Sequence, residues 1–151
     1  MSEIAVIYAS VHHGNTKRLL EEASSDIGID LINAENAAHT DLSKYKAVGF
    51  ASGIYMSKFH KSLVNFLDSK PILPKNTFII YTSGSGGKKY ADAISKQLVG
   101  LDLKILGVYK CKGYDTYGPF KIIGGIAKGH PNRDDAEKCS DFLKNNVCAK
   151  L

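Results

Sequence analysis

The amino-acid sequence predicts an α/β fold in which helices cover both faces of a parallel, doubly wound sheet. Three observations lead to this prediction. Five short apolar segments alternate with segments of helical periodicity, and the apolar segments lack the polar alternation of strands that face water. The chain has 151 residues, of which 44% are hydrophobic, as expected for one domain. We therefore expect a single domain over residues 1–151 with five parallel strands, since right-handed crossovers place the intervening helices on both faces.

The first 43 residues contain two predicted strands and one predicted helix. The first strand is Ile4–Ala9, which is rich in β-branched residues. A polar turn follows it, and apolar residues at helical spacing predict a helix over residues 15–27. Gly28 then turns the chain into a second strand over residues 29–32. The polar residues 33–43 are expected to form a loop.

The rest of the chain repeats this alternation. Further strands are expected over residues 46–51, 77–82 and 104–109. Helices are expected over residues 59–67, over residues 90–99, and after Pro131, where Asn132 is a candidate N-cap.

The most informative segment is the polar turn Ser10-Val-His-His-Gly-Asn-Thr16. Backbone N–H groups at the start of the following helix and the positive end of its dipole favour a phosphate in this turn. The hydroxyls of Ser10 and Thr16 can donate to the same phosphate, and Asn15 can hold the turn or reach a ligand. The pattern Gly-x-x-x-x-Gly-Lys-Ser/Thr of nucleoside-triphosphate loops is absent, so a monophosphate is expected. The alternative is an ordinary strand-to-helix turn.

This turn resembles the FMN phosphate loop of flavodoxins and flavodoxin-like oxidoreductases. It is one residue longer than the commonest form, Ser/Thr-x-x-Gly-Asn-Thr, and the longer spacing also occurs in the branch that contains menaquinone-dependent protoporphyrinogen dehydrogenases. The resemblance implies a short-chain, flavodoxin-like three-layer α/β/α sandwich with strand order 2-1-3-4-5 and FMN as the cofactor. It also implies that the whole turn binds the phosphate, with the backbone amides of His12 and His13 more important than their rings: Ser10, Val11, His12, His13, Gly14, Asn15 and Thr16.

Two further segments rich in Gly or Ser follow the third and fourth predicted strands. In doubly wound sheets a ligand lies at the carboxyl ends of the strands, so these segments are expected to join the turn in one site. In the flavodoxins that the chain resembles, they flank the isoalloxazine and bind its pyrimidine edge through backbone groups. The candidate cofactor-binding residues are Ser52, Gly53, Ile54, Tyr55 and Met56 in the first segment and Ser83, Gly84, Ser85 and Gly86 in the second.

Tyr55 is the candidate for stacking on the isoalloxazine, with Ile54 and Met56 excluding water around it. The alternative is that Tyr55 packs on the following helix. Many flavodoxins place a Trp against the flavin, but this chain has none. Tyr90 at a helix start is interpreted as structural. The segment 113–120 resembles the stretch after strand five of small flavodoxin-domain proteins and either lines the flavin edge or forms a structural turn.

The chain is basic, with 20 Lys and Arg against 15 Asp and Glu and a net charge of +5. Several of these cations are expected near the strand ends: Lys58, His60, Lys61, Lys88, Lys89, Lys110 and Lys112. A positive rim would attract acidic redox partners or a small anionic acceptor; the alternative is that the lysines are dispersed and serve solubility. No dense basic run supports nucleic-acid binding.

Several other classes fit poorly. The three Cys are odd in number and lack Cys-x-x-Cys spacing, which argues against disulfides and zinc, and no metal is expected. A response-regulator receiver needs an acid pair after strand one and an Asp after strand three, where Ala9-Ser10 and Ala51-Ser52 stand. We find neither a secretory signal nor an apolar stretch of membrane-spanning length, so a cytoplasmic protein is expected.

We therefore expect an FMN-binding electron-transfer protein that carries low-potential electrons between redox partners, with no catalytic side chain of its own. An FMN-dependent oxidoreductase acting on a quinone, a porphyrinogen or another small acceptor is the alternative. A flavin-free interaction module is the alternative from another class.

Overall fold

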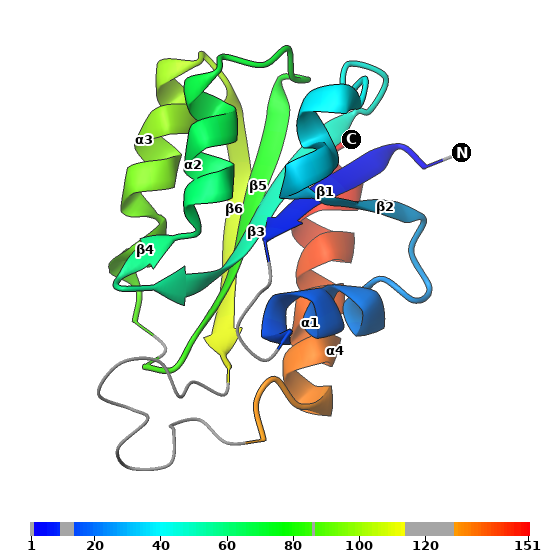
Figure 1. Ribbon diagram of the computed structural model, residues 1–151. Helices are drawn as coiled ribbons and strands as arrows, with labels where there is room; N and C mark the ends of the chain where they lie inside the picture. Colours follow the sequence, from blue (N-terminus) through cyan, green and yellow to red (C-terminus); the bar gives the residue numbers. More distant parts are fainter. Residues whose placement is uncertain (1, 10–13, 86, 114–128) are drawn as a thin grey trace.

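The computed structural model describes residues 2–9, 14–85, 87–113 and 129–151. Its centre is a parallel sheet with the strand order β2-β1-β3-β5-β6, and helices pack on both faces (Figure 1). The strands are β1 (Ile4–Ala9), β2 (Ile29–Asn33), β3 (Ala47–Tyr55), β5 (Asn76–Ser83) and β6 (Lys104–Lys112). Counted along the chain, these five parallel strands have the order 2-1-3-4-5, which confirms the predicted flavodoxin-like topology.

The helices form the two outer layers. They are α1 (Asn15–Ala23), α2 (Lys61–Asp68), α3 (Asp92–Gly100) and α4 (Arg133–Phe142). Buried side chains of α2 and α3 share one core cluster with the sheet, and those of α1 and α4 share the other. Because both faces are covered, β1 is buried along its whole length.

A short antiparallel strand, β4 (Lys58–Phe59), was not predicted. It pairs with the end of β3, where Ile54 lies opposite Phe59 and Tyr55 opposite Lys58. Met56 and Ser57 form the two-residue turn, and both have positive φ angles, 51° and 65°. β3 therefore includes residues 52–55, whereas the predicted strand ended at residue 51, because the hairpin extends it. Neither turn residue is Gly, so the usual sequence signal for such a hairpin is missing.

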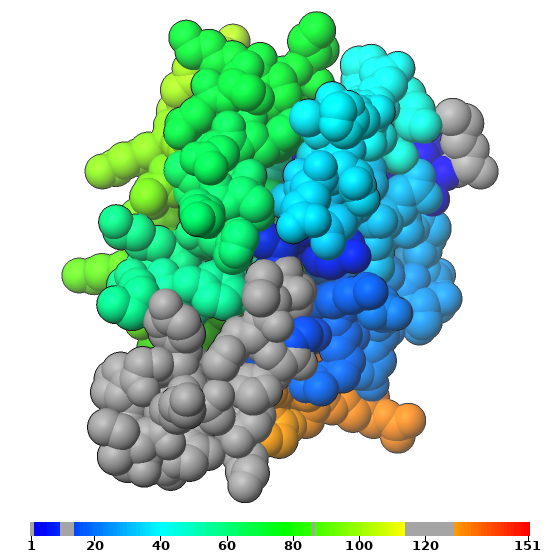
Figure 2. All heavy atoms as spheres, viewed as in Figure 1, coloured from blue at the N-terminus to red at the C-terminus, as the bar shows by residue number. Residues whose placement is uncertain are grey.

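The segment 33–43 is also not the predicted loop. It contains a 3₁₀ helix, η1 (Ala34–His39), whose N-cap Asn33 accepts a hydrogen bond from the Glu35 N–H at 3.0 Å. Ala34 and Ala37 are buried in the same cluster as α2, and η1 (cyan) and α2 (green) lie side by side in the space-filling view (Figure 2). This tertiary contact explains why a polar segment is helical.

The helix boundaries differ from prediction in three places. α1 ends at Ala23 instead of residue 27. At the observed end, the Ser24 hydroxyl donates to the Leu20 carbonyl at 2.6 Å. α2 begins at Lys61, after His60 as N-cap. The predicted helix 90–99 is split into a 3₁₀ turn, η2 (Lys89–Ala91), and α3.

The last helix confirms the prediction for Asn132. Its side chain accepts from the Asp135 N–H at 2.9 Å, and the Asp135 carboxylate accepts from the Asn132 N–H at 2.8 Å. This reciprocal capping box satisfies two otherwise unpaired donors at the helix start. The helix continues through a π segment, η4 (Leu143–Val147), and a 3₁₀ turn, η5 (Cys148–Lys150). None of the helices in the described ranges is long and apolar enough to cross a membrane.

Candidate functional site

The parallel register brings the ends of four strands together at one edge of the sheet. Ala9 lies beside Ser52, Gly53 beside Thr82, and Ser83 beside Lys112. Gly113 continues this line, because its N–H donates to the Ser83 carbonyl at 3.0 Å. The predicted segments after β1, β3 and β5 therefore start from neighbouring positions, at the place where doubly wound sheets bind ligands.

The start of α1 is suited to an anion. Gly14 is the N-cap in a left-handed conformation (φ 65°), and no described side chain caps the helix. The first turn contains no acidic residue, whereas Lys17 and Arg18 are both basic. The start of α4 is the opposite case, since it has a capping box and two acidic residues in its first turn. The positive end of the α1 dipole is thus left without an anionic side chain of its own.

Asn15 and Thr16 are held in the core beneath this helix start. Thr16 is 1% exposed, and its hydroxyl lies 3.1 Å from the hydroxyl of Thr82, which is 2% exposed. Asn15 is 7% exposed and accepts a hydrogen bond from Arg18 at 3.3 Å. The Thr16 side chain therefore anchors α1 to β5. Sequence reasoning missed Thr82, although a hydroxyl at the buried end of an apolar strand was a signal for it.

Gly113 closes this region from the side of β6. A Cβ atom placed on Gly113 would lie 2.8 Å from the Asn15 side-chain nitrogen and 3.1 Å from the Thr82 Cβ. Real Cβ atoms essentially never approach another atom as closely as 2.8 Å, so the absence of a side chain at Gly113 permits the contact between these three residues.

The residues after β3 lie in the β3–β4 hairpin. Ser52 is fully buried, and its hydroxyl donates to the Gly53 carbonyl at 2.5 Å and accepts from the His60 N–H at 3.0 Å. It thereby fixes the hairpin to the start of α2. Ile54 and Tyr55 are half-buried, and Met56 at the hairpin turn is 71% exposed.

Tyr55 folds back over the hairpin. Its hydroxyl would lie 2.9 Å from a Cβ atom on Gly53, so the glycine makes room for the ring. The ring also meets His60 edge to face, with centroids 5.3 Å apart. Tyr55 therefore contacts the N-cap of α2 and remains half-buried, which leaves both predicted roles, flavin stacking and packing, available to it.

The turn after β5 is fixed by two tyrosines. The buried Tyr81 donates its hydroxyl to the Gly87 carbonyl at 2.6 Å, and burial raises its pKa. The hydroxyls of Ser85 and Tyr90 lie 2.9 Å apart. Tyr90 thus holds the turn, in agreement with the structural role predicted for it. Ser83 and Gly84 are buried, while Ser85 is exposed.

Several predicted residues lie outside the described part of the chain. These are Ser10, Val11, His12, His13 and Gly86, together with residues 114–120.

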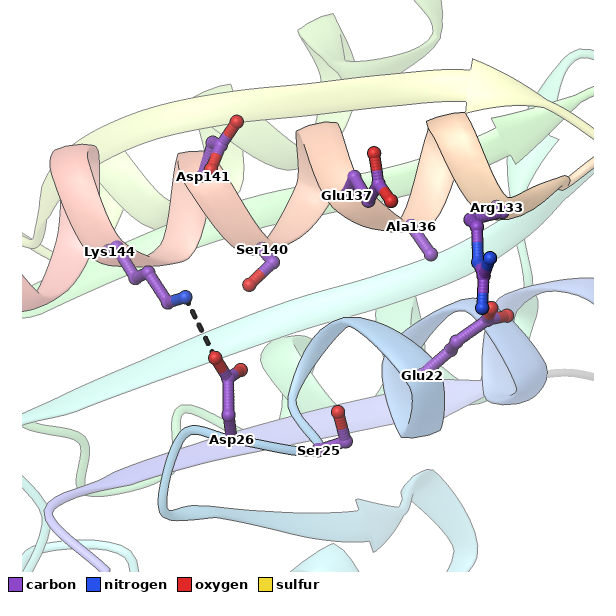
Figure 3. Close-up of a pocket in the computed structure, with 9 residues that line it drawn as sticks. All are labelled: Glu22, Ser25, Asp26, Arg133, Ala136, Glu137, Ser140, Asp141 and Lys144. Carbon is purple, nitrogen blue, oxygen red and sulfur yellow. Dashed lines mark hydrogen bonds and ion pairs between the residues drawn. The ribbon is translucent and has the colours of Figure 1, made fainter.

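A groove between α1 and α4 lies apart from the strand ends that form the candidate site (Figure 3). It has a volume of about 540 Å³ and is lined by Glu22, Ser25, Asp26, Arg133, Ala136, Glu137, Ser140, Asp141 and Lys144. Lys144 pairs with Asp26 at 2.8 Å, which raises the pKa of Lys144 and lowers that of Asp26. Arg133 and Glu22 point toward one another. Opposite charges thus face each other across a polar groove, which is typical of a packed helix pair.

The cysteines do not contribute reactive thiols to the site. Cys111 and Cys139 are buried and unpaired. Burial raises the pKa of both thiols, that of Cys139 to about 12, so they are protonated near neutral pH. Cys148 is exposed. Within the described ranges, no group of His, Cys, Asp and Glu residues is placed to hold a metal ion.

Comparison with known proteins agrees with this geometry. A family model described as flavodoxin domain matches residues 5–113. A protein of Methanocaldococcus jannaschii that is described as uncharacterized is 37% identical over 142 residues, which cover 93% of this chain and 95% of that protein.

Solved structures show the same fold at low sequence identity. A flavodoxin from the domain Archaea superposes with a TM-score of 0.69 at 14% identity and covers 98% of this chain and 99% of its own. A flavoprotein in complex with FMN from Lactobacillus acidophilus gives a TM-score of 0.59 at 15% identity, covering 73% of this chain and 93% of its own.

Proposed function

We propose that this chain, which belongs to the flavodoxin domain family, binds FMN at the carboxyl ends of β1, β3 and β5 and transfers electrons between redox partners. The observation that carries the proposal is the strand register, which brings the three predicted cofactor segments to neighbouring positions at one edge of the sheet. FMN needs a phosphate cradle and a cleft for its ring, and these segments are suited to supply both.

The start of α1 fits the phosphate. Gly14 in its left-handed conformation turns the chain into the helix, and the first turn carries Lys17 and Arg18 but no acid. A dianionic phosphate is stabilised there by the helix dipole and by backbone N–H donors. We propose that Asn15 and Thr16 give this cradle its fixed shape, because both are buried and contact residues at the ends of the neighbouring strands.

The hairpin and the turn after β5 fit the ring. Small residues keep bulk away from this edge, and Tyr55 offers a half-buried aromatic face beside them. When bound, FMN accepts and releases one or two electrons, while the protein binds it and tunes its potential. The side chains of this chain are thus needed for binding, orientation and exclusion of water.

The lysines support acidic partners. Lys58, Lys61 and Lys89 lie on β4, α2 and η2, next to the hairpin and the turn after β5. Exposed cations at the mouth of a redox site accelerate encounter with partners of opposite charge. We propose acidic redox proteins as the partners of this chain.

An FMN-dependent oxidoreductase acting on a small acceptor is the second candidate. The spacing of the phosphate loop, which is shared with the protoporphyrinogen-dehydrogenase branch, favours it. Steady-state turnover of NAD(P)H or a quinol without a separate reductase would support this candidate over the carrier.

The proposal is tested by titrating the apoprotein with FMN and, in parallel, with riboflavin, which lacks the phosphate. Flavin fluorescence and the visible spectrum report binding. We expect FMN to bind at least about 100-fold more tightly, since several charge-assisted hydrogen bonds are made only by the phosphate. Equal affinities for FMN and riboflavin would contradict the proposed phosphate cradle. No binding of either flavin would favour a flavin-free interaction module.

A further inference from the structure

A second groove lies on the sheet face opposite α1 and α4, between the β3–β4 hairpin, α2 and α3. Its volume is about 630 Å³, within the range of roughly 300 to 1,000 Å³ of small-molecule sites. Its walls include Phe59, Val64, Tyr90 and Ile94. Phe59 and Ile94 are buried, and Val64 and Tyr90 pack against the same core, so the wall is backed by the protein interior.

Four exposed lysines surround this apolar wall, and we call the whole groove the lysine groove. They are Lys58, Lys61, Lys89 and Lys96. Asp92 is the one acidic residue in the lining, and within the described ranges none of the four lysines is ion-paired. The lining therefore carries four positive charges against one negative, and its potential is positive.

The α1–α4 groove shows that this charge pattern is not a general property of the surface. There, four acids (Glu22, Asp26, Glu137 and Asp141) face two bases, Arg133 and Lys144. One of those bases is already paired, and Ala136 is the one apolar side chain in the lining. The lysine groove differs in combining unpaired cations with an apolar wall.

The shape of the lysine groove is fixed by contacts between its two helices. The Gln97 side-chain nitrogen donates to the Asp68 carboxylate at 2.8 Å and to the Val64 carbonyl at 3.4 Å, which ties α3 to α2. Because the walls are preformed, a ligand loses little free energy in ordering them.

We propose that the lysine groove binds small organic anions that carry an apolar body of aromatic size. The lysines provide ion pairs for a carboxylate or sulfonate, and the wall of Phe59, Val64 and Ile94 removes the apolar body from water. The groove neighbours the candidate flavin site, because Lys58 faces Tyr55 across the hairpin. It is not part of that site, because none of the candidate cofactor-binding residues lines it. Binding here does not require the flavin, so this proposal is independent of the proposed function.

The probe is 8-anilinonaphthalene-1-sulfonate, an aromatic anion that fluoresces when it is removed from water. It is titrated into the full chain with and without saturating FMN, and its neutral relative N-phenyl-1-naphthylamine is titrated in parallel. We expect the anion to bind at least about fivefold more tightly than the neutral compound, and saturating FMN to leave its affinity within twofold.

Two pairs of variants locate the site. The double variant Lys61→Glu/Lys89→Glu reverses two rim charges, and Lys70→Glu/Lys104→Glu is its control for net charge, because Lys70 and Lys104 are exposed and neither is part of the lining. Ala93→Trp fills the groove, and Val99→Trp places the same bulk at an exposed position of α3 outside the lining.

We expect Lys61→Glu/Lys89→Glu to weaken binding of the anion at least tenfold and Lys70→Glu/Lys104→Glu to leave it within about twofold. Ala93→Trp should abolish binding of both compounds and Val99→Trp should leave it unchanged. The proposal is overturned if FMN displaces the probe, if Ala93→Trp and Val99→Trp behave alike, or if charge reversal at Lys61 and Lys89 has no effect. Circular dichroism verifies the fold of every variant. FMN binding is titrated separately, so that failure of the flavin proposal can be told apart from failure of the anion-binding proposal.

Discussion

The two ends of the candidate FMN site are built differently. At the phosphate end, Asn15 and Thr16 are buried and contact Thr82 in β5 and Gly113 directly after β6. At the ring end, the hairpin turn is exposed and Tyr55 is half-buried. The phosphate end is therefore part of the core, whereas the ring end is a surface feature fixed at a few points.

This difference separates contacts with the phosphate of FMN from contacts with the flavin ring. Changes at the phosphate end alter contacts that riboflavin cannot make, so they should change the ratio of FMN to riboflavin affinity. Changes at the ring end alter contacts shared by both flavins, so they should leave that ratio unchanged. Four substitutions test the distinction, from the largest expected effect to the smallest.

Asn15→Asp should have the largest effect. It adds a negative charge of nearly the same shape at the phosphate end, and the positive end of the helix dipole offsets part of the cost of burying that charge. Two unit charges about 6 Å apart repel by about 3 kcal/mol at an effective dielectric constant of 20. We expect FMN to bind about 30- to 150-fold more weakly, with riboflavin changed much less.

Fluorescence titration measures both affinities. Asn65→Asp, at an exposed position of α2, makes the same chemical change away from the strand ends and should leave both within twofold. Equal losses for FMN and riboflavin in Asn15→Asp would show that Asn15 serves the ring or the fold instead of the phosphate.

Gly113→Ala should have the second largest effect. The added methyl group would lie 2.8 Å from the Asn15 side-chain nitrogen and 3.1 Å from the Thr82 Cβ, and overpacking of this kind costs about 1 to 3 kcal/mol. We expect a lower midpoint of chemical denaturation and FMN affinity reduced about tenfold. Gly100→Ala, where a Cβ meets nothing within 4 Å, is the control. Unchanged stability and affinity would mean that Asn15 and Gly113 do not need their close contact.

Tyr55→Ala should weaken FMN and riboflavin equally. Loss of an aromatic contact of about 0.5 to 1.5 kcal/mol corresponds to about 2- to 12-fold in affinity. Tyr55→Phe keeps the ring and should retain the wild-type values. A change in the FMN to riboflavin ratio in Tyr55→Ala would contradict the separation of the two ends.

Ser57→Gly should have the smallest effect on flavins and a small positive effect on stability. Ser57 has a φ angle of 65° at the hairpin turn, a conformation that Gly adopts without steric cost. We expect the free energy of unfolding to rise by about 0.5 to 1 kcal/mol in urea titrations, with FMN affinity within twofold. A loss of stability would indicate that the Ser57 side chain contributes contacts that outweigh its backbone strain.

Much of this architecture was predictable because it depends on local patterns. Buried strands such as Ile4–Ala9 are continuous apolar runs, and Asn132 with Asp135 is a capping signal readable along the chain. What could not be predicted depends on contacts between distant segments. The hairpin turn at Met56 and Ser57 has no Gly, and η1 is helical because its alanines pack on α2.

The same division holds for the candidate site. The neighbourhood of the three strand ends follows from the topology and could be predicted. The hydroxyl pair of Thr16 and Thr82, 66 residues apart in the chain, and the contact of Gly113 with Asn15 depend on register and side-chain direction. Neither can be read from the order of residues along the chain.

The two helix starts described above also differ in what they imply for motion. The α4 helix is closed by its own capping box, whereas α1 begins at a glycine with two cations and no acid. A ligand that binds only the folded chain stabilises it by about 2.7 kcal/mol when the ligand concentration is about 100 times the dissociation constant. Amide protons in the first turn of α1 should therefore exchange with solvent faster in the apoprotein and slow on addition of FMN, while the first turn of α4 exchanges at the same local rate in both.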